Sequence, residues 1–181
     1  DEIYEHGRLC GVGVAFKFAH ALLKSAGTAE ESAKKFLMAQ MDLVALGTVA
    51  DMVPLEGKNR VFLRHGLPAI LNTLRPGLRA LLGVAGYRPR RMTPDFVAFG
   101  LGPRLNAAGR TDDPMLALRL LLTRDKKEGE SLARELDRLN RERRTIEEDI
   151  LGESREAAEE ALKRGLAHTL VVGGEGWHLG V

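Results

Sequence analysis

Two features of the sequence could do chemistry: a carboxylate placed in a tight turn, and a concentration of arginine. Asp51 follows an apolar stretch that predicts a buried helix, and Pro54 keeps Val53 out of the helical region. We therefore expect Asp51 in a turn at the foot of that helix, where a rigid backbone can direct its carboxylate. Carboxylate oxygens are preferred ligands of hard divalent cations. The ordinary structural role of an aspartate in a turn is a cap or an Asx-turn.

The charged residues are segregated along the chain. Residues 57–110 contain ten cations and one acid, Asp95, whereas residues 125–164 contain ten cations and thirteen acids. Guanidinium groups pair bidentately with phosphate oxygens, and arginine clusters are typical of phosphate binding. A basic surface that is merely solvated is the alternative, and charge by itself leaves both interpretations open.

Composition excludes several classes of protein. The 181 residues carry a net charge of +2 and 44% hydrophobic residues, which argues against a histone-like, acidic-tail or disordered chain. Cys10 is the sole cysteine, so the chain cannot form an intramolecular disulfide. No apolar run approaches the ~18 residues of a membrane span, and no signal peptide is apparent. We expect a globular chain of cytosolic type.

The elements that must position these residues are predicted to be helices. Apolar spacing and end signals predict helices over 11–26, 29–46, 59–74, 78–84, 95–101 and 115–122. Thr28 and Glu31 predict a capping box for the second of them, and Thr93-Pro94 is a helix opening. The stretch from Gly102 to Arg110 then follows the helix that ends near Leu101.

Residues 125–164 predict one long helix with a narrow apolar stripe. Forty residues at ~1.5 Å each give about 60 Å, much longer than most globular helices. Such a helix fits a strut between two domains, and a dimerising coiled coil is the alternative. Residues 169–172 predict a short strand that would need partner strands from a second domain.

Three stretches, in this order, resemble the RecJ family of single-strand-specific exonucleases within the DHH phosphoesterase superfamily. They are residues 42–55 (DLVALGTVADMVPL), 103–110 (PRLNAAGR) and 174–181 (GEGWHLGV). Residues 11–17 also look like the helix that follows the DHH motif of this family. The resemblance extends over essentially the whole chain.

The resemblance implies a mainly α chain that is part of a larger α/β architecture. Residues 1–124 would be the later part of the DHH catalytic domain, 125–165 the long interdomain helix, and 166–181 the start of a truncated DHHA1-like domain. The Asp-x-Asp pair, the further aspartate and the Asp-His-His motif of the family do not occur in this sequence.

The resemblance also assigns roles to individual residues. Asp51 matches an aspartate that ligates the catalytic metal pair, Mn²⁺ or Mg²⁺. Arg104, Asn106 and Arg110 match a motif near the scissile phosphate, with helix stabilisation as the structural alternative. His178 belongs to a motif that faces the nucleic-acid channel.

The implied activity is metal-dependent 5′→3′ exonucleolytic hydrolysis of single-stranded DNA in cytoplasmic DNA repair and recombination. A single-strand-binding protein and a helicase are the implied protein partners. We expect the chain by itself to be inactive, because one carboxylate cannot hold two metal ions. The alternatives are another DHH-type phosphodiesterase acting on short nucleotides, or a non-catalytic nucleic-acid-binding fragment.

Overall fold

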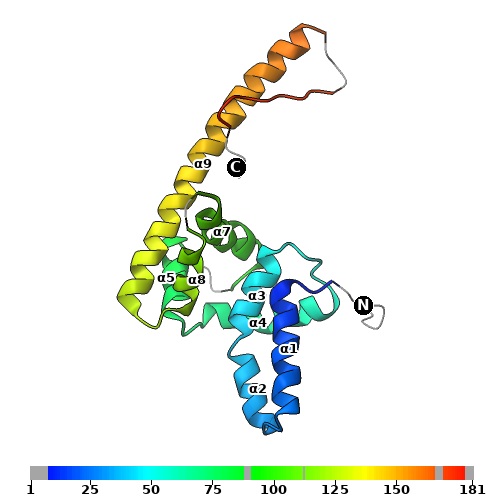
Figure 1. Ribbon diagram of the computed structural model, residues 1–181, viewed down its shortest axis with the longest axis vertical. Coiled ribbons are helices and arrows are strands. Elements are labelled where there is room, and N and C mark those ends of the chain that lie inside the picture. Colours follow the sequence, from blue (N-terminus) through cyan, green and yellow to red (C-terminus); the bar gives the residue numbers. More distant parts are fainter. Residues whose placement is uncertain (1–7, 88–90, 112, 166–168, 178–181) are drawn as a thin grey trace.

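The computed structural model describes residues 8–87, 91–111, 113–165 and 169–177, and these form helices joined by short connections (Figure 1). The helices are α1 (Gly11–Ser25), α2 (Glu30–Met38), α3 (Met41–Ala50), α4 (Gly57–Leu71), α5 (Pro76–Val84), α6 (Pro94–Phe96), the π-helical turn η1 (Val97–Leu101), α7 (Gly102–Thr111), α8 (Met115–Leu122) and α9 (Lys126–Lys163). The mainly helical class is confirmed. None of the described helices is both long and apolar enough to cross a bilayer.

The main core lies where α3, α4, α5, η1, α7, α8 and the first part of α9 meet. Its fully buried side chains come from distant parts of the sequence, namely Ile70, Leu78, Leu101, Leu120 and Leu136. Burying each large aliphatic side chain contributes about 2 kcal/mol to folding before entropy is counted. The helices that flank Asp51 and Arg104 are therefore held by a common core.

A smaller cluster joins α1 to this body. Met41, Val44 and Phe62 are buried there, and Phe16 packs edge-to-face on Phe62 with ring centroids 5.3 Å apart. Beyond this contact α1 and α2 extend away from the core as a hairpin (Figure 1).

The helix predicted over 29–46 is wrong in its extent, because two helices form with a break at Ala39–Gln40. The burial explains the break: α2 buries only Leu37, whereas α3 is buried on nearly all sides, so the chain must change direction between them. The capping box is also absent, because the amide of Thr28 donates to the carbonyl of Leu23 in closing α1. Gly27, with φ +65°, makes this closure possible.

The helix expected to end near Leu101 continues beyond that residue. Thr93 caps it as predicted, because its hydroxyl oxygen accepts a hydrogen bond from the amide of Phe96 at 3.2 Å. The backbone then passes through η1 directly into α7, so the stretch expected to follow the helix is itself helical. π-helical turns are rare and frequently lie at functional sites.

The predicted long helix is confirmed as α9. Asp125 caps it by accepting a hydrogen bond from the amide of Glu128 at 2.7 Å. Hydrogen bonds from Thr123 and Arg119 lower the pKa of the Glu128 carboxyl. The buried residues of α9 all lie between Gly129 and Asn140, and the rest of the helix projects away from the core (Figure 1).

The strand predicted over 169–172 does not form, and the described residues 169–177 contain none. A strand requires the backbone hydrogen bonds of a neighbouring strand, and no neighbour is present among the described residues. The segment turns back towards α9 instead (Figure 1), and the indole Nε1 of Trp177 donates to Oε2 of Glu153 at 2.6 Å.

Candidate metal and phosphate site

Asp51 lies immediately after the last residue of α3, as the sequence predicts. Its backbone amide donates to the carbonyl of Gly47 and closes the helix, whereas its carboxylate is exposed. Within the described residues this carboxylate makes no hydrogen bond or ion pair, so it caps no helix and forms no Asx-turn there. An exposed carboxylate whose oxygens are free suits a divalent cation.

The turn that presents Asp51 contains a strained residue. Met52 has φ +53°, a left-handed conformation that is uncommon for a side chain of this size, and 88% of its surface is exposed. Such strain persists only where the surroundings hold it, and it is frequent at functional sites. Asn59 provides part of that support, because its buried Nδ2 donates to the carbonyls of Pro54 at 2.9 Å and Arg8 at 2.8 Å.

A partly buried ion pair fixes the opposite end of α3. The carboxylate of Asp42 accepts hydrogen bonds from the Thr73 hydroxyl at 2.7 Å and from Nε of Arg75 at 3.1 Å. Arg75 also donates to Oε1 of Gln40 at 2.7 Å. Sequence reasoning missed this pair, because no local signal connects residues 33 positions apart. It holds the helix from which Asp51 extends.

The foot of α3 meets the start of α7. A methyl group added at Gly102 would lie 3.7 Å from Cβ of Ala50, which is ordinary van der Waals contact. Asp51 follows Ala50 directly, and Arg104 is two residues after Gly102. The structure therefore places the two sequence motifs side by side, although their residues are more than fifty positions apart.

The guanidinium of Arg104 is engaged with the protein itself. Its Nε donates to Oδ1 of Asp137 on α9 at 2.8 Å, and its Nη1 donates to the carbonyl of Gly100 at 2.6 Å. Only 15% of the Arg104 side chain and 16% of the Asp137 side chain are exposed. This pairing corresponds to the structural alternative, helix stabilisation. A role of Arg104 at a phosphate stays a prediction.

The other predicted residues differ in how much the structure describes. Asn106 is exposed on α7. Arg110 lies one turn further along α7, but its side chain is outside the described residues, as is the whole of His178. Only Asp51, Arg104 and Asn106 can therefore be placed at the level of side chains.

No complete metal site lies within the part of the chain that the structure describes, since no three His, Cys, Asp or Glu side chains cluster there. Asp51 fits as one ligand. Two-metal phosphodiester hydrolysis needs several carboxylate or imidazole ligands around the two metal ions.

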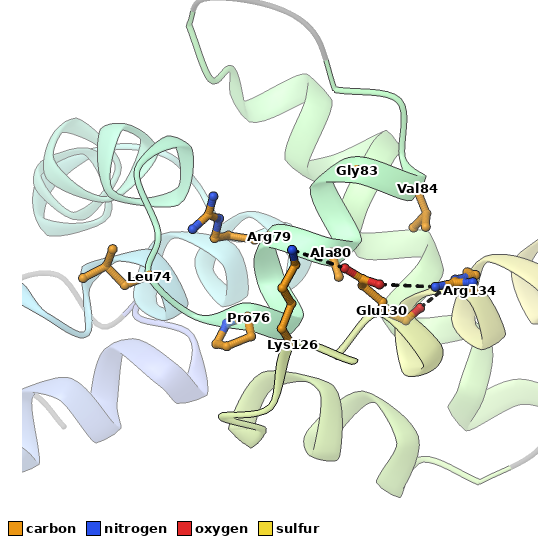
Figure 2. Close-up of a pocket in the computed structure, with 9 residues that line it drawn as sticks. All are labelled: Leu74, Pro76, Arg79, Ala80, Gly83, Val84, Lys126, Glu130 and Arg134. Atoms are coloured by element: carbon orange, nitrogen blue, oxygen red, sulfur yellow. Dashed lines mark hydrogen bonds and ion pairs between the residues drawn. The ribbon is translucent and has the colours of Figure 1, made fainter. Parts of the chain in front are cut away.

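A cationic pocket between α5 and α9 is a possible competitor for phosphate, but its charges are largely compensated. Figure 2 shows the Glu130 carboxylate paired with Lys126 on one side and Arg134 on the other, and it shows no such pairing for Arg79. The carboxylate oxygens lie 3.9 Å from Nζ of Lys126 and 3.4 Å from Nη2 of Arg134. None of the residues predicted from the sequence lines this pocket.

Comparison with known proteins gives one consistent result. The chain is 43% identical to the single-stranded-DNA-specific exonuclease RecJ of Salmonella typhimurium over 96% of its own length and 31% of that protein. It is 40% identical to RecJ of Bacillus subtilis, over 98% of the chain and 21% of the relative. The chain thus spans about a third or less of the length of these curated relatives. No family model matches it.

Solved structures agree with the sequence similarity. RecJ from Thermus thermophilus in complex with Mn²⁺ superimposes with a TM-score of 0.73 and 38% identity, over 83% of this chain and 22% of that one. Its complex with Mg²⁺ gives a TM-score of 0.74 over 84% of this chain and 23% of that one, again at 38% identity. The chain is homologous to a segment of RecJ, and the resemblance found in the sequence is confirmed.

Proposed function

We propose that this chain, as a homologue of one segment of RecJ, serves metal-dependent hydrolysis of phosphodiester bonds in single-stranded DNA. The observation that carries the proposal is the unpaired carboxylate of Asp51, which a strained turn presents beside the start of α7. The relatives are named for this activity, and the Thermus thermophilus structures contain Mn²⁺ or Mg²⁺.

Each residue has a defined part in the proposal. Asp51 contributes a ligand to the divalent cations, which when bound activate water and stabilise the leaving oxygen. The exposed Asn106 amide orients a phosphate oxygen, and Arg104 and Arg110 neutralise phosphate charge. Because Asp137 fixes Nε of Arg104, that guanidinium is oriented before substrate arrives.

The finer features of the activity belong to the same proposal. They are 5′→3′ polarity, service in DNA repair and recombination, a cytoplasmic location, and cooperation with a single-strand-binding protein and a helicase. The division into a DHH domain (1–124), an interdomain helix (125–165) and the start of a DHHA1-like domain (166–181) is proposed as well. His178 would face the nucleic-acid channel.

A chimera of Thermus thermophilus RecJ, with its matched segment replaced by this chain, tests the proposal. We expect it to degrade a single-stranded oligonucleotide from the 5′ end with Mn²⁺, and Asp51→Asn to slow this by about 100-fold or more. Asp149→Asn, an equivalent change at an exposed position of α9, is the control and should have no effect. A fully active Asp51→Asn chimera would contradict the metal role.

Two further assays separate the alternatives. A chimera that cleaves dinucleotides faster than long single strands would favour a phosphodiesterase for short substrates. The 181-residue chain alone should show no Mn²⁺-stimulated nuclease activity, because Asp51 cannot hold two metal ions unaided.

A further inference from the structure

A groove beside the Asp51 loop collects arginines that the sequence spreads over more than thirty positions. Arg60 and Arg64 line it from α4, and Arg91 lines it from the segment that precedes α6. Leu67 and Met92 form part of its apolar lining. The sequence shows that residues 57–110 are basic, whereas the fold determines which of their arginines converge.

The charge of this groove is uncompensated. Arg60, Arg64 and Arg91 are all exposed. Among the described residues their guanidinium groups make no ion pair or hydrogen bond, and no carboxylate lines the groove. Arg60 and Arg64 are also one turn apart on α4, where like charges repel each other. In the pocket of Figure 2, by contrast, Glu130 pairs with two of the three cations. The α4 groove is therefore the better site for a polyanion.

The groove is continuous with the loop that carries Asp51. Leu55 lines the groove, and four extended residues span at most about 14 Å, so the carboxylate is within reach of a ligand lying there. The loop is fixed at this point, because Asn59, the residue before Arg60, donates to the carbonyl of Pro54 at 2.9 Å.

We propose that Arg60, Arg64 and Arg91 bind successive phosphates of a single-stranded polynucleotide that extends from Asp51 along α4. Guanidinium groups match phosphate oxygens bidentately, and the apolar lining suits the sugar and base faces of an unpaired strand. This inference rests on the proposed function, which supplies a reason for a strand to approach Asp51. An acidic protein segment is the competing occupant.

The test measures binding of the 181-residue chain to a fluorescein-labelled dT12 oligonucleotide by anisotropy between 50 and 200 mM NaCl. The variant is the triple substitution Arg60→Ala/Arg64→Ala/Arg91→Ala. The matched control, Arg79→Ala/Lys126→Ala/Arg134→Ala, removes the same formal charge from the pocket of Figure 2. Thermal melting followed by circular dichroism checks that each variant folds. If the triple variant does not fold, the single substitution Arg64→Ala replaces it in the binding assay.

We expect the α4 variant to lose about tenfold or more in affinity. The slope of log K against log salt should become less negative by about 2, since each phosphate contact contributes about −0.7 to that slope. Arg64→Ala alone should flatten it by about 0.7. The control variant should keep the wild-type slope. Equal losses in both variants, or no loss in the α4 variant, would overturn the proposal, as would failure of the wild-type chain to bind.

The outcome is distinguishable from failure of the proposed function. If the groove variant binds dT12 like the wild type while the chimera cleaves DNA through Asp51, the groove assignment is wrong and the function stands. If the groove variant loses binding while the chimera is inactive, the groove stands and the nuclease proposal falls.

Discussion

At the scale of single residues, Arg104 and Asp137 show how a residue proposed for chemistry can also support the fold. The pair is mostly buried and joins α7 to α9, and Asp137 lies 3.4 Å from Arg141 as well. Removing the carboxylate leaves a partly buried guanidinium without its partner, which is costly. The position of Arg104 thus depends on α9, a helix that follows α7 and α8 in the chain.

We expect Asp137→Ala to lower the free energy of unfolding by about 2 kcal/mol, less than the roughly 3–5 kcal/mol of a fully buried pair because some solvent reaches both groups. Urea denaturation measures the change. Glu142→Ala, which removes an exposed partner of Arg138 on the same helix, should cost no more than about 0.5 kcal/mol. Equal effects of the two substitutions would show that the Arg104 pair adds nothing beyond a surface ion pair.

At the scale of elements, two glycines let α5 cross α9 and approach α8 closely. A methyl group at Gly77 would lie 1.8 Å from the carbonyl oxygen of Leu120, and one at Gly129 would lie 3.1 Å from Cα of Gly77. No real Cβ fits at the first of these distances, so a larger residue must push the helices apart. The packing of α9 on the core therefore depends on the absence of a side chain.

Gly77→Ala should lower the free energy of unfolding by about 2 kcal/mol or more through this overpacking. The control is Gly83→Ala on the same helix, where nothing lies within 4 Å of the added methyl. There the better helix propensity of alanine should stabilise the protein by about 0.5–1 kcal/mol. Guanidinium denaturation compares the two, and a Gly77→Ala protein as stable as Gly83→Ala would disprove the close crossing.

At the scale of the whole molecule, α9 is anchored at one end and solvated at the other. Its buried residues end at Asn140, and the part beyond carries ion pairs such as that of Glu160 with Arg164, in which both side chains are exposed. Exposed pairs of this kind add little stability. The outer part of the helix should therefore open without unfolding the core.

Hydrogen exchange followed by mass spectrometry checks this expectation. Amides of residues 145–163 should exchange at least about tenfold faster than those of residues 130–140, because opening them exposes few apolar contacts. Uniform protection along α9 that increases with protein concentration would instead indicate the dimerising coiled coil.

Local signals in the sequence were sufficient for much of the fold and for the place of Asp51 in the chain. The bounds of α8, the cap at Thr93 and the length of α9 follow from periodicity and capping, which act within a few residues. Asp51 was placed correctly in its turn because Pro54 restricts the backbone nearby. The break at Ala39–Gln40 was missed, because the change from a half-buried to a fully buried helix depends on what packs around it.

What only the tertiary structure decided are the relations between distant residues. Gly102 lies close to Ala50, Arg104 pairs with Asp137, and Arg91 lines the same groove as Arg60 and Arg64. These relations join positions 27 to 52 residues apart. Charge and residue type identify which groups can bind metal or phosphate. Their distances are set by the packing of whole helices on a shared core, and no pattern within a single helix contains that information.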